Sequence, residues 1–297
     1  MAGENERIDQ HVYSQGSIDK WVYSTCNICS VGCGCYIAVK DEEIVEIKGN
    51  GSHPVNRGRL GPKGENRWYA YQAPDRLKTP LIRNDSGELQ PTTWNEAMDL
   101  IVSNAKQSLK EKGSSNSVSV YSTGQGFYED YYTIAKIGRA GLQTNLLDAN
   151  TRLCTATTEF CLLQLFGADG TPASFDDIDK TDTLMLFGHN AADTGTVLFE
   201  QIMDHKNRTG KPYLIVVDPR KTMTAKEADL HLQLSPGTNI TLLNGLLNEI
   251  LHRGEIDNHF LKQHTVDFDK MKESVKDWTL EDPVKATNIS LEQRRCD

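Results

Sequence analysis

The chain has 297 residues, of which 38% are hydrophobic and 25% charged, and its formal net charge at pH 7 is -9. This composition is enough to bury a core in two compact units or one large one, which argues against disorder. The acidic balance and the lack of a dense Lys/Arg cluster exclude a nucleic-acid partner. No apolar run reaches the roughly 18 residues of a spanning helix, so membrane insertion is not expected.

Residues 1–20 are polar and contain neither an apolar export segment nor a twin-arginine pair. We therefore expect a cytoplasmic protein, in which thiols stay reduced. The seven cysteines, an odd number, are then better interpreted as metal ligands than as disulfides.

The first predicted element is a β-hairpin that directly follows a group of cysteines. Apolar and polar residues alternate over residues 36–40 and 44–48, around the turn 41–43. The Gly-Asn-Gly segment 49–51 ends the hairpin with residues that tolerate positive φ. A small cysteine-bearing domain is expected over residues 1–78.

Helical and strand patterns alternate downstream. Thr93 and Glu96 form a capping-box pattern that begins a helix ending by Gly113. A short strand is predicted at 118–121 and a helix at 127–140, followed by an irregular stretch up to Cys154. Further strands are predicted at residues 183–187, 213–217 and 230–234. The alternation predicts an α/β fold over residues 79–297, a doubly wound, mostly parallel sheet with helices on both faces.

Each of the last three strands runs into a polar loop, over residues 188–193, 218–222 and 235–239. Ligands bind at the carboxyl ends of the strands in an open parallel sheet. We therefore expect these loops to contact a cofactor.

The spacing Cys26-x2-Cys29-x3-Cys33 places three thiolates in one loop, which suits an iron-sulfur cubane. Zinc could use the same sulfurs, with a fourth ligand from Cys35 or His53. A third interpretation is a set of small buried hydrophobic side chains without metal. The spacing is not the paired C-x2-C of a zinc ribbon, which favours iron-sulfur.

Further motifs accompany the cysteines: His-Pro-Val-Asn-Arg-Gly-Arg-Leu at 53–60, Pro-Lys-Gly at 62–64, Ala-Pro-Asp-Arg-Leu at 73–77 and Asp-Pro-Arg at 218–220. In combination they resemble the N-terminal part of the molybdopterin oxidoreductase (DMSO reductase) family, most of all the catalytic subunits of assimilatory-type nitrate reductases. The resemblance covers nearly the whole chain. It implies an iron-sulfur domain (4Fe-4S Mo/W bis-MGD type) at 1–78 and a molybdopterin oxidoreductase domain at 79–297 that is incomplete at its C-terminal end.

Two cofactors are implied by the resemblance: an iron-sulfur cluster on Cys26, Cys29 and Cys33, and molybdenum bis-molybdopterin guanine dinucleotide. Most members carry a fourth cluster cysteine just before Pro-Lys-Gly, where this chain has Gly61. Either Cys35 or a non-cysteine group supplies the fourth ligand, or the cluster is 3Fe-4S, or no cluster forms. A cluster with an altered fourth site is the preferred hypothesis.

Residues 151–157 resemble the segment in which nitrate reductases of the family carry their molybdenum ligand, here Cys154. A soft thiolate suits that metal. Formate dehydrogenases of the family typically place a histidine directly after this ligand, whereas this chain has Thr155. Arg152 also fits the nitrate reductase pattern, and its guanidinium would suit an oxyanion, a pterin phosphate or a surface carboxylate. Cys161 is expected to pack in the interior.

Other matched positions imply contacts to the pterin dinucleotide. Asp218 can accept N–H groups of guanine, with a plain strand-ending turn as the alternative, and the helix start at Gly237 and Thr238 suits a pyrophosphate. Lys63 corresponds to the position between cluster and pterin, where it eases electron transfer; the alternative is a solvated lysine. The complete set of implied cofactor contacts is Lys63, Gln125, Asn145, Asn190, Asp193, Asp218, Arg220, Gly237 and Thr238.

The resemblance implies oxygen-atom transfer that reduces nitrate to nitrite, with electrons delivered through the cluster from a donor protein or subunit. Full catalytic chains of the family are about twice this length or more, beyond a single domain core. A fragment or truncated product, or a split enzyme whose second chain completes the cofactor cage, is therefore considered. The alternative functions are a formate dehydrogenase-like subunit, a non-catalytic iron-sulfur electron relay and a zinc-stabilised nucleotide-binding protein.

Overall fold

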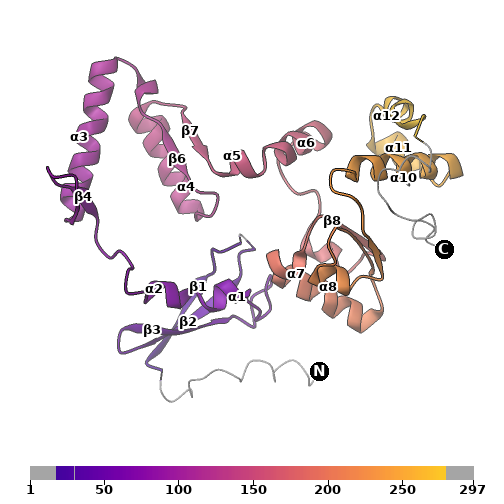
Figure 1. The fold of residues 1–297 in the computed structure, drawn as a ribbon, viewed down its shortest axis with the longest axis horizontal. Helices are drawn as coiled ribbons and strands as arrows, with labels where there is room; N and C mark the ends of the chain where they lie inside the picture. Colours follow the sequence, from indigo (N-terminus) through magenta and orange to yellow (C-terminus); the bar gives the residue numbers. More distant parts are fainter. Residues whose placement is uncertain (1–17, 30, 279–297) are drawn as a thin grey trace. The chain divides into compact units, whose positions relative to one another are not determined.

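The computed structural model describes residues 18–29 and 31–278 (Figure 1). The chain divides into two compact units, Met1–Ala173 and Ser174–Asp297. None of the described helices is long and apolar enough to cross a membrane.

The first unit begins with an antiparallel sheet of order β1-β2-β3, made of β1 (Lys20–Thr25), β2 (Gly34–Lys40) and β3 (Glu43–Gly49). Asp41 and Glu42 connect β2 to β3 with φ angles of 49° and 63°. Such a turn matches the right-handed twist of the paired strands. The predicted hairpin is confirmed, but β1 was not predicted, because its apolar residues are consecutive and lack the alternation of period two.

The remaining elements of this unit are α1 (Pro62–Glu65), α2 (Arg67–Tyr71), β4 (Leu81–Arg83), β5 (Leu89–Pro91), α3 (Trp94–Lys112), η2 (Ser115–Ser117), β6 (Val120–Ser122), α4 (Tyr128–Ala135), η3 (Lys136–Leu142), β7 (Leu147–Ala149), α5 (Thr151–Cys154) and α6 (Ala156–Phe166). Thr93 and Glu96 form the predicted capping box, and α3 ends at Gly113, whose φ is +64°.

The helix expected at 127–140 is confirmed, as α4 followed by the π-helix η3. One prediction in this region was wrong. The stretch before Cys154 is not irregular, since it holds β7 and α5, and β7 pairs with β6 in parallel from Val120↔Leu147 to Ser122↔Ala149. A strand of three residues is too short for its hydrophobic period to be recognised in the sequence.

The second unit has a parallel sheet of order β10-β9-β8, made of β8 (Thr183–Phe187), β9 (Tyr213–Val217) and β10 (Leu230–Leu232). Its helices are η4 (Phe175–Asp177), α7 (Ala191–Thr194), α8 (Thr196–Thr209), α9 (Met223–Lys226), α10 (Asn239–Arg253), α11 (Asn258–His264) and α12 (Phe268–Val275).

Alternate residues of β9 face opposite cores. Leu214 and Val216 pack with residues of α7, α8 and α9, whereas Ile215 and Val217 pack with Leu242 of α10. Helices therefore cover both faces, and the α/β fold class with parallel strands is confirmed. The described parallel strands lie in two sheets, one in each unit, rather than in one.

Asp229 lies directly before β10, and its side chain is hydrogen-bonded to β9. Its carboxylate accepts the backbone N–H of Leu214 at 2.6 Å and forms an ion pair with Lys206 of α8. Burial acts to raise the pKa of Asp229, but the Leu214 hydrogen bond and Lys206 outweigh it, and the pKa is lowered. The ionised carboxylate thus stabilises the second unit.

We predict that Asp229→Asn lowers the free energy of unfolding by about 1–2 kcal/mol near neutral pH, because charged hydrogen bonds are lost. The folded pKa lies below the unfolded value of about 3.9, so the stabilisation is present above that value and disappears as pH falls through the folded pKa. Urea unfolding followed by circular dichroism at several pH values measures the difference. Asp182→Asn removes an exposed ion pair with Lys211 and should change stability by less than about 0.5 kcal/mol.

Candidate functional site

The cysteines lie where β1 and β2 begin to separate. The backbone N–H of Cys26 donates to the carbonyl of Cys33 at 2.9 Å, which extends the β1–β2 ladder by one pair. Cys33 and Cys35 are each 3% exposed, Cys26 is half-buried and Cys29 is exposed. One short segment therefore gathers four sulfur atoms in surroundings that range from solvent to core.

Burial raises the pKa of Cys33 to about 12, and the neighbouring Cys26 and Cys29 thiolates add to the shift. Burial and Cys26 also raise the pKa of Cys35, while Arg67 opposes them. A metal centre would relieve this repulsion, because it binds the thiolate and displaces the proton. The soft donor set therefore fits an iron-sulfur cluster.

Across residues 18–29 and 31–278, no three His, Cys, Asp or Glu side chains converge closely enough to hold a single metal ion. Tetrahedral zinc needs such convergence, since all of its ligands meet at one atom. A cubane is bound differently, because its sulfurs surround the cluster on separate irons. The described residues thus place four thiols in one short segment without a preformed site for a single ion.

The segment after β3 packs over the cysteines through close backbone contacts. A Cβ placed on Gly64 would lie 3.0 Å from Sγ of Cys26, and one on Gly49 would lie 2.1 Å from the carbonyl oxygen of Gly58. Only glycine permits such approaches. Lys63 is exposed on the same short helix α1 as Gly64, so the predicted relay lysine is adjacent in sequence to a residue that touches the cysteine site.

Asn56 is fully buried and fixes the backbone between the two buried cysteines. Its Oδ1 accepts the N–H of Gly34 at 2.9 Å, and its Nδ2 donates to the carbonyls of Gly34 at 3.0 Å and Arg59 at 2.6 Å. The amide thereby ties β2 to the segment that carries Gly61 and Lys63. Sequence reasoning did not single out Asn56, although it lies in the motif at 53–60.

We predict that Asn56→Ala lowers the free energy of unfolding by about 1–3 kcal/mol, because it leaves the buried N–H of Gly34 without its acceptor. Cys33 and Cys35 should also become open to alkylation, which mass spectrometry of iodoacetamide-treated protein measures residue by residue. Asn66→Ala removes an exposed bond to the Pro62 carbonyl and serves as the control. Unchanged labelling of Cys33 and Cys35 in Asn56→Ala would contradict the assigned role.

Cys154, the predicted metal ligand, follows β7, which pairs in parallel with β6. It is the last residue of α5, directly after β7, and it is exposed. The N–H of Gly124, after β6, donates to Oδ1 of Asn150 at 2.6 Å, and a Cβ on Gly124 would lie 2.4 Å from Cγ2 of Thr151. The loops that follow β6 and β7 therefore meet at the start of α5, the short helix that ends at Cys154.

Gln125 links this place to the cysteine loop. Its Nε2 donates to the carbonyl of Ile28, between Cys26 and Cys29, at 2.7 Å. The two residues are separated by 97 positions in the chain. The segment that carries Cys154 and the segment that carries the cysteines are thus both in contact with the loop 124–126.

Arg152 lies on α5 with its guanidinium half exposed. It forms ion pairs with Asp148 at 3.2 Å and Glu159 at 3.5 Å, the surface-carboxylate alternative raised by the sequence. Asn145 is exposed just before β7, and its carbonyl accepts the N–H of Leu147 at 2.8 Å. Cys161 is exposed on α6, so the expectation that it packs in the interior was wrong.

In the second unit, the loops after β8 and β9 are joined by hydrogen bonds. Asn190 is paired with Asp193, and its Oδ1 accepts the hydroxyl of buried Thr224 at 2.8 Å. Asp218 is 5% exposed, and its Oδ1 accepts the N–H of Arg220 at 2.8 Å. The structure thus brings these four predicted residues into two adjoining loops.

Gly237 and Thr238 precede α10. Gly237 has a φ of +85°, and Thr238 is the N-cap residue of α10 without a side-chain cap bond. Its hydroxyl donates instead to the Ser235 carbonyl at 2.7 Å. The first amides of α10 are thus not capped by the Thr238 side chain.

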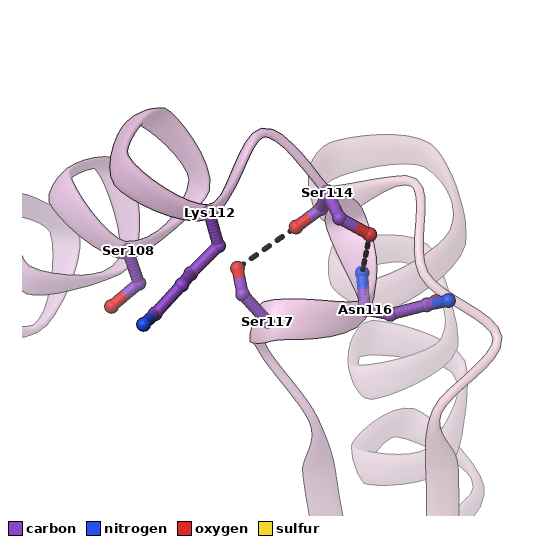
Figure 2. A pocket seen from close by; sticks show the side chains of 5 residues that line it. All are labelled: Ser108, Lys112, Ser114, Asn116 and Ser117. Atoms are coloured by element: carbon purple, nitrogen blue, oxygen red, sulfur yellow. Dashed lines mark hydrogen bonds between the residues drawn. The ribbon is translucent and has the colours of Figure 1, made fainter.

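An open hollow lies at the end of α3 (Figure 2). Hydroxyl groups dominate its lining: Ser108, Lys112, Ser114, Asn116 and Ser117. Ser114 and Ser117 are engaged in local hydrogen bonds of η2. None of the predicted cofactor residues lines this hollow.

Comparison with known proteins identifies both parts of the chain. The family model described as molybdopterin oxidoreductase matches residues 76–273, and that of the molybdopterin oxidoreductase Fe4S4 domain matches residues 19–71. F420-dependent formate dehydrogenase subunit alpha of Methanocaldococcus jannaschii is 36% identical over 92% of this chain and 39% of the relative. Nitrate reductase of Symbiobacterium thermophilum is 32% identical over 93% of this chain and 38% of the relative.

Among solved structures, acetylene hydratase from Pelobacter acetylenicus superposes with a TM-score of 0.80 at 25% identity. The match covers 92% of this chain and 37% of that protein. The chain therefore spans about two fifths of the length of the proteins it matches.

Proposed function

Because the chain belongs to the molybdopterin oxidoreductase family, we propose that it forms the cofactor-binding part of a molybdenum enzyme that reduces nitrate to nitrite. The observation that carries the proposal is the exposed Cys154 at the end of α5, because the start of this helix contacts the loop 124–126 that also bonds to the cysteine segment. Molybdenum and its pterins, when bound, supply the oxygen-atom transfer chemistry.

Each part of the chain then has a distinct role. Cys154 holds the molybdenum, and Cys26, Cys29 and Cys33 hold the iron-sulfur cluster through which electrons arrive. Lys63 lies between the two groups. Arg152, which is ion-paired with Asp148 and Glu159, exchanges these carboxylates for the anionic substrate. The dinucleotide contacts fall to Gln125, Asn145, Asn190, Asp193, Asp218, Arg220, Gly237 and Thr238. The boundary between the iron-sulfur and molybdopterin domains is placed near residue 78.

Nitrate is favoured over formate by the residue that follows the metal ligand. Thr155 donates its hydroxyl to the carbonyl of Thr151 at 3.1 Å, which occupies it within α5. A threonine cannot take up a proton from substrate near neutral pH as a histidine can. Formate oxidation is the second candidate, supported by the 36% identity to a formate dehydrogenase subunit.

We predict that the purified protein contains molybdenum and iron, that it oxidises reduced viologen with nitrate, and that it does not reduce an oxidised dye with formate. Cys154→Ala should lower the molybdenum content and nitrate turnover by about 100-fold or more while iron stays bound, because even residues behind a ligand cost 10–100-fold. Cys161→Ala, a nearby exposed cysteine, should leave both metals unchanged. Iron without molybdenum in the unaltered protein would instead support an electron relay, and zinc alone would support neither.

The partners proposed are an electron-donor protein and a polypeptide that completes the cofactor cage. Large apolar side chains lie exposed along α3 and α6, among them Trp94 at 69%, Ile101 at 59% and Leu165 at 74%. Apolar patches of this kind mark surfaces that another element covers. We propose that the region corresponding to the remainder of the relatives, on the same polypeptide or a second one, covers them in a cytoplasmic enzyme.

We predict that the 297-residue chain alone binds the dye ANS and self-associates, and that adding the matching downstream region of a relative suppresses both effects. Ile101→Glu with Leu165→Glu should weaken the complex at least about 10-fold, because charges would be buried without partners. Calorimetric titration measures the affinity. Lys106→Glu on the polar side of α3 is the control, and equal binding by all variants would contradict this surface.

A further inference from the structure

The proposed cluster has three sulfurs from the loop 26–33 and needs a fourth ligand that Gly61 cannot offer. This inference rests on the proposed function, because it concerns the cluster of that enzyme. The described residues contain two candidates near the loop, Cys35 and His53. The pairing of β1 with β2 shows which of these two residues lies on the same face of the sheet as Cys26 and Cys33.

The β1–β2 register assigns each residue to a face of the sheet. Ser24 pairs with Cys35 and Thr25 with Gly34, and the hydrogen bond from Cys26 to Cys33 adds the next pair. Successive pairs point to opposite faces, so Cys26, Cys33 and Cys35 share one face. Tyr23 and Tyr36 confirm the alternation, since their rings meet edge to face at 5.8 Å on the other side.

The face of the sheet that carries Cys26, Cys33 and Cys35 has space beside Cys35, and the segment after β3 packs over it. Opposite Cys35 on β3 stands Gly49, which has no side chain. The backbone of Gly58 lies over Gly49, and Gly64 lies against Sγ of Cys26. The segment that carries Gly61 therefore roofs the same face, and Cys35 is buried beneath it with 3% exposure.

His53 lies on the opposite face. Its ring atoms Cδ2 and Cγ would be 2.5 and 2.7 Å from a Cβ on Gly34, and Gly34 points away from the side shared by Cys33 and Cys35. The Nδ1 of His53 is buried without a hydrogen-bond partner in the described structure, so burial alone would have favoured it. The position of His53 on the other face of the sheet excludes it as the fourth ligand.

We propose that Cys35 supplies the fourth thiolate of the iron-sulfur cluster, in place of a side chain at Gly61. The Cys35 thiol releases its proton to solvent as the iron–sulfur bond forms, and no electron is transferred in that step. The buried segment Cys33-Gly34-Cys35, fixed by Asn56, thus carries two ligands on one strand face.

The test is anaerobic reconstitution of the full chain with ferrous iron and sulfide, followed by iron and acid-labile sulfide analysis and electron paramagnetic resonance. The unaltered protein should bind about four irons. Cys35→Ala should retain about three, with the paramagnetic signal of an oxidised 3Fe-4S cluster. Adding Gly61→Cys to Cys35→Ala should restore the fourth iron, which a merely misfolded variant could not do.

Cys161→Ala and His53→Ala are the matched controls, and both should bind iron as the unaltered protein does. The role of Cys35 would be overturned if Cys35→Ala bound four irons, or if the unaltered protein and the variant both bound three. Neither result would contradict the proposed enzyme function. Loss of the fourth iron in His53→Ala instead would also overturn the role of Cys35. A chain that binds no iron at all would overturn this assignment and the cluster of the proposed function together.

Discussion

The cysteine site depends on one buried amide. Asn56 bonds to both the N–H and the carbonyl of Gly34, so it behaves like an additional strand residue where the β1–β2 ladder is about to open. Without it, the N–H of Gly34 between two buried thiols would lose its partner, which is costly, whereas the Gly34 carbonyl would keep the N–H of Asn50 at 2.9 Å. The same amide also bonds to the carbonyl of Arg59, which holds the segment leading to Gly61 and α1 over the sulfurs.

Close backbone approach extends this constraint to the second predicted metal position. Gly124 lies so near Thr151 that no side chain fits between them, and the neighbouring Gln125 donates to Ile28. Three loops from distant parts of the first unit are therefore held by contacts that involve backbone atoms. In each of these contacts a side chain of one loop meets the backbone of another, so the three loops are linked directly and not through a further element.

Local features of the fold were predictable from the sequence, and tertiary ones were not. The strands at 183–187 and 213–217 were predicted with the bounds that the structure gives, because each is a compact apolar run between turn residues. The capping box at Thr93 was likewise predictable, since it is written in two residues three positions apart. By contrast, β7 is a strand only because it pairs with β6, and the bond between Gln125 and Ile28 joins residues 97 positions apart. Neither feature can be recognised from neighbouring residues in the sequence.

For the candidate site, the residue types were predictable but their directions were not. The sequence offered Cys35 or His53 as the fourth ligand of a zinc ion, and Cys35 or a non-cysteine group as that of a cluster, without a choice between them. Only the register of β1 with β2 distinguishes them, since a shift by one residue moves a side chain to the other face of a sheet. The pairing of β1 was itself not predicted, so this choice was beyond sequence reasoning.

Asp218 illustrates how one side chain can serve both folding and recognition. Its Oδ1 accepts the N–H of Arg220 and shapes the turn after β9, while its carbonyl accepts from Nε2 of His231. A carboxylate oxygen can accept more than one hydrogen bond, so the proposed contact with guanine does not require the turn to open. The turn and the proposed cofactor contact, which the sequence presented as alternatives, do not exclude each other, because the bond to Arg220 uses one of the two oxygens.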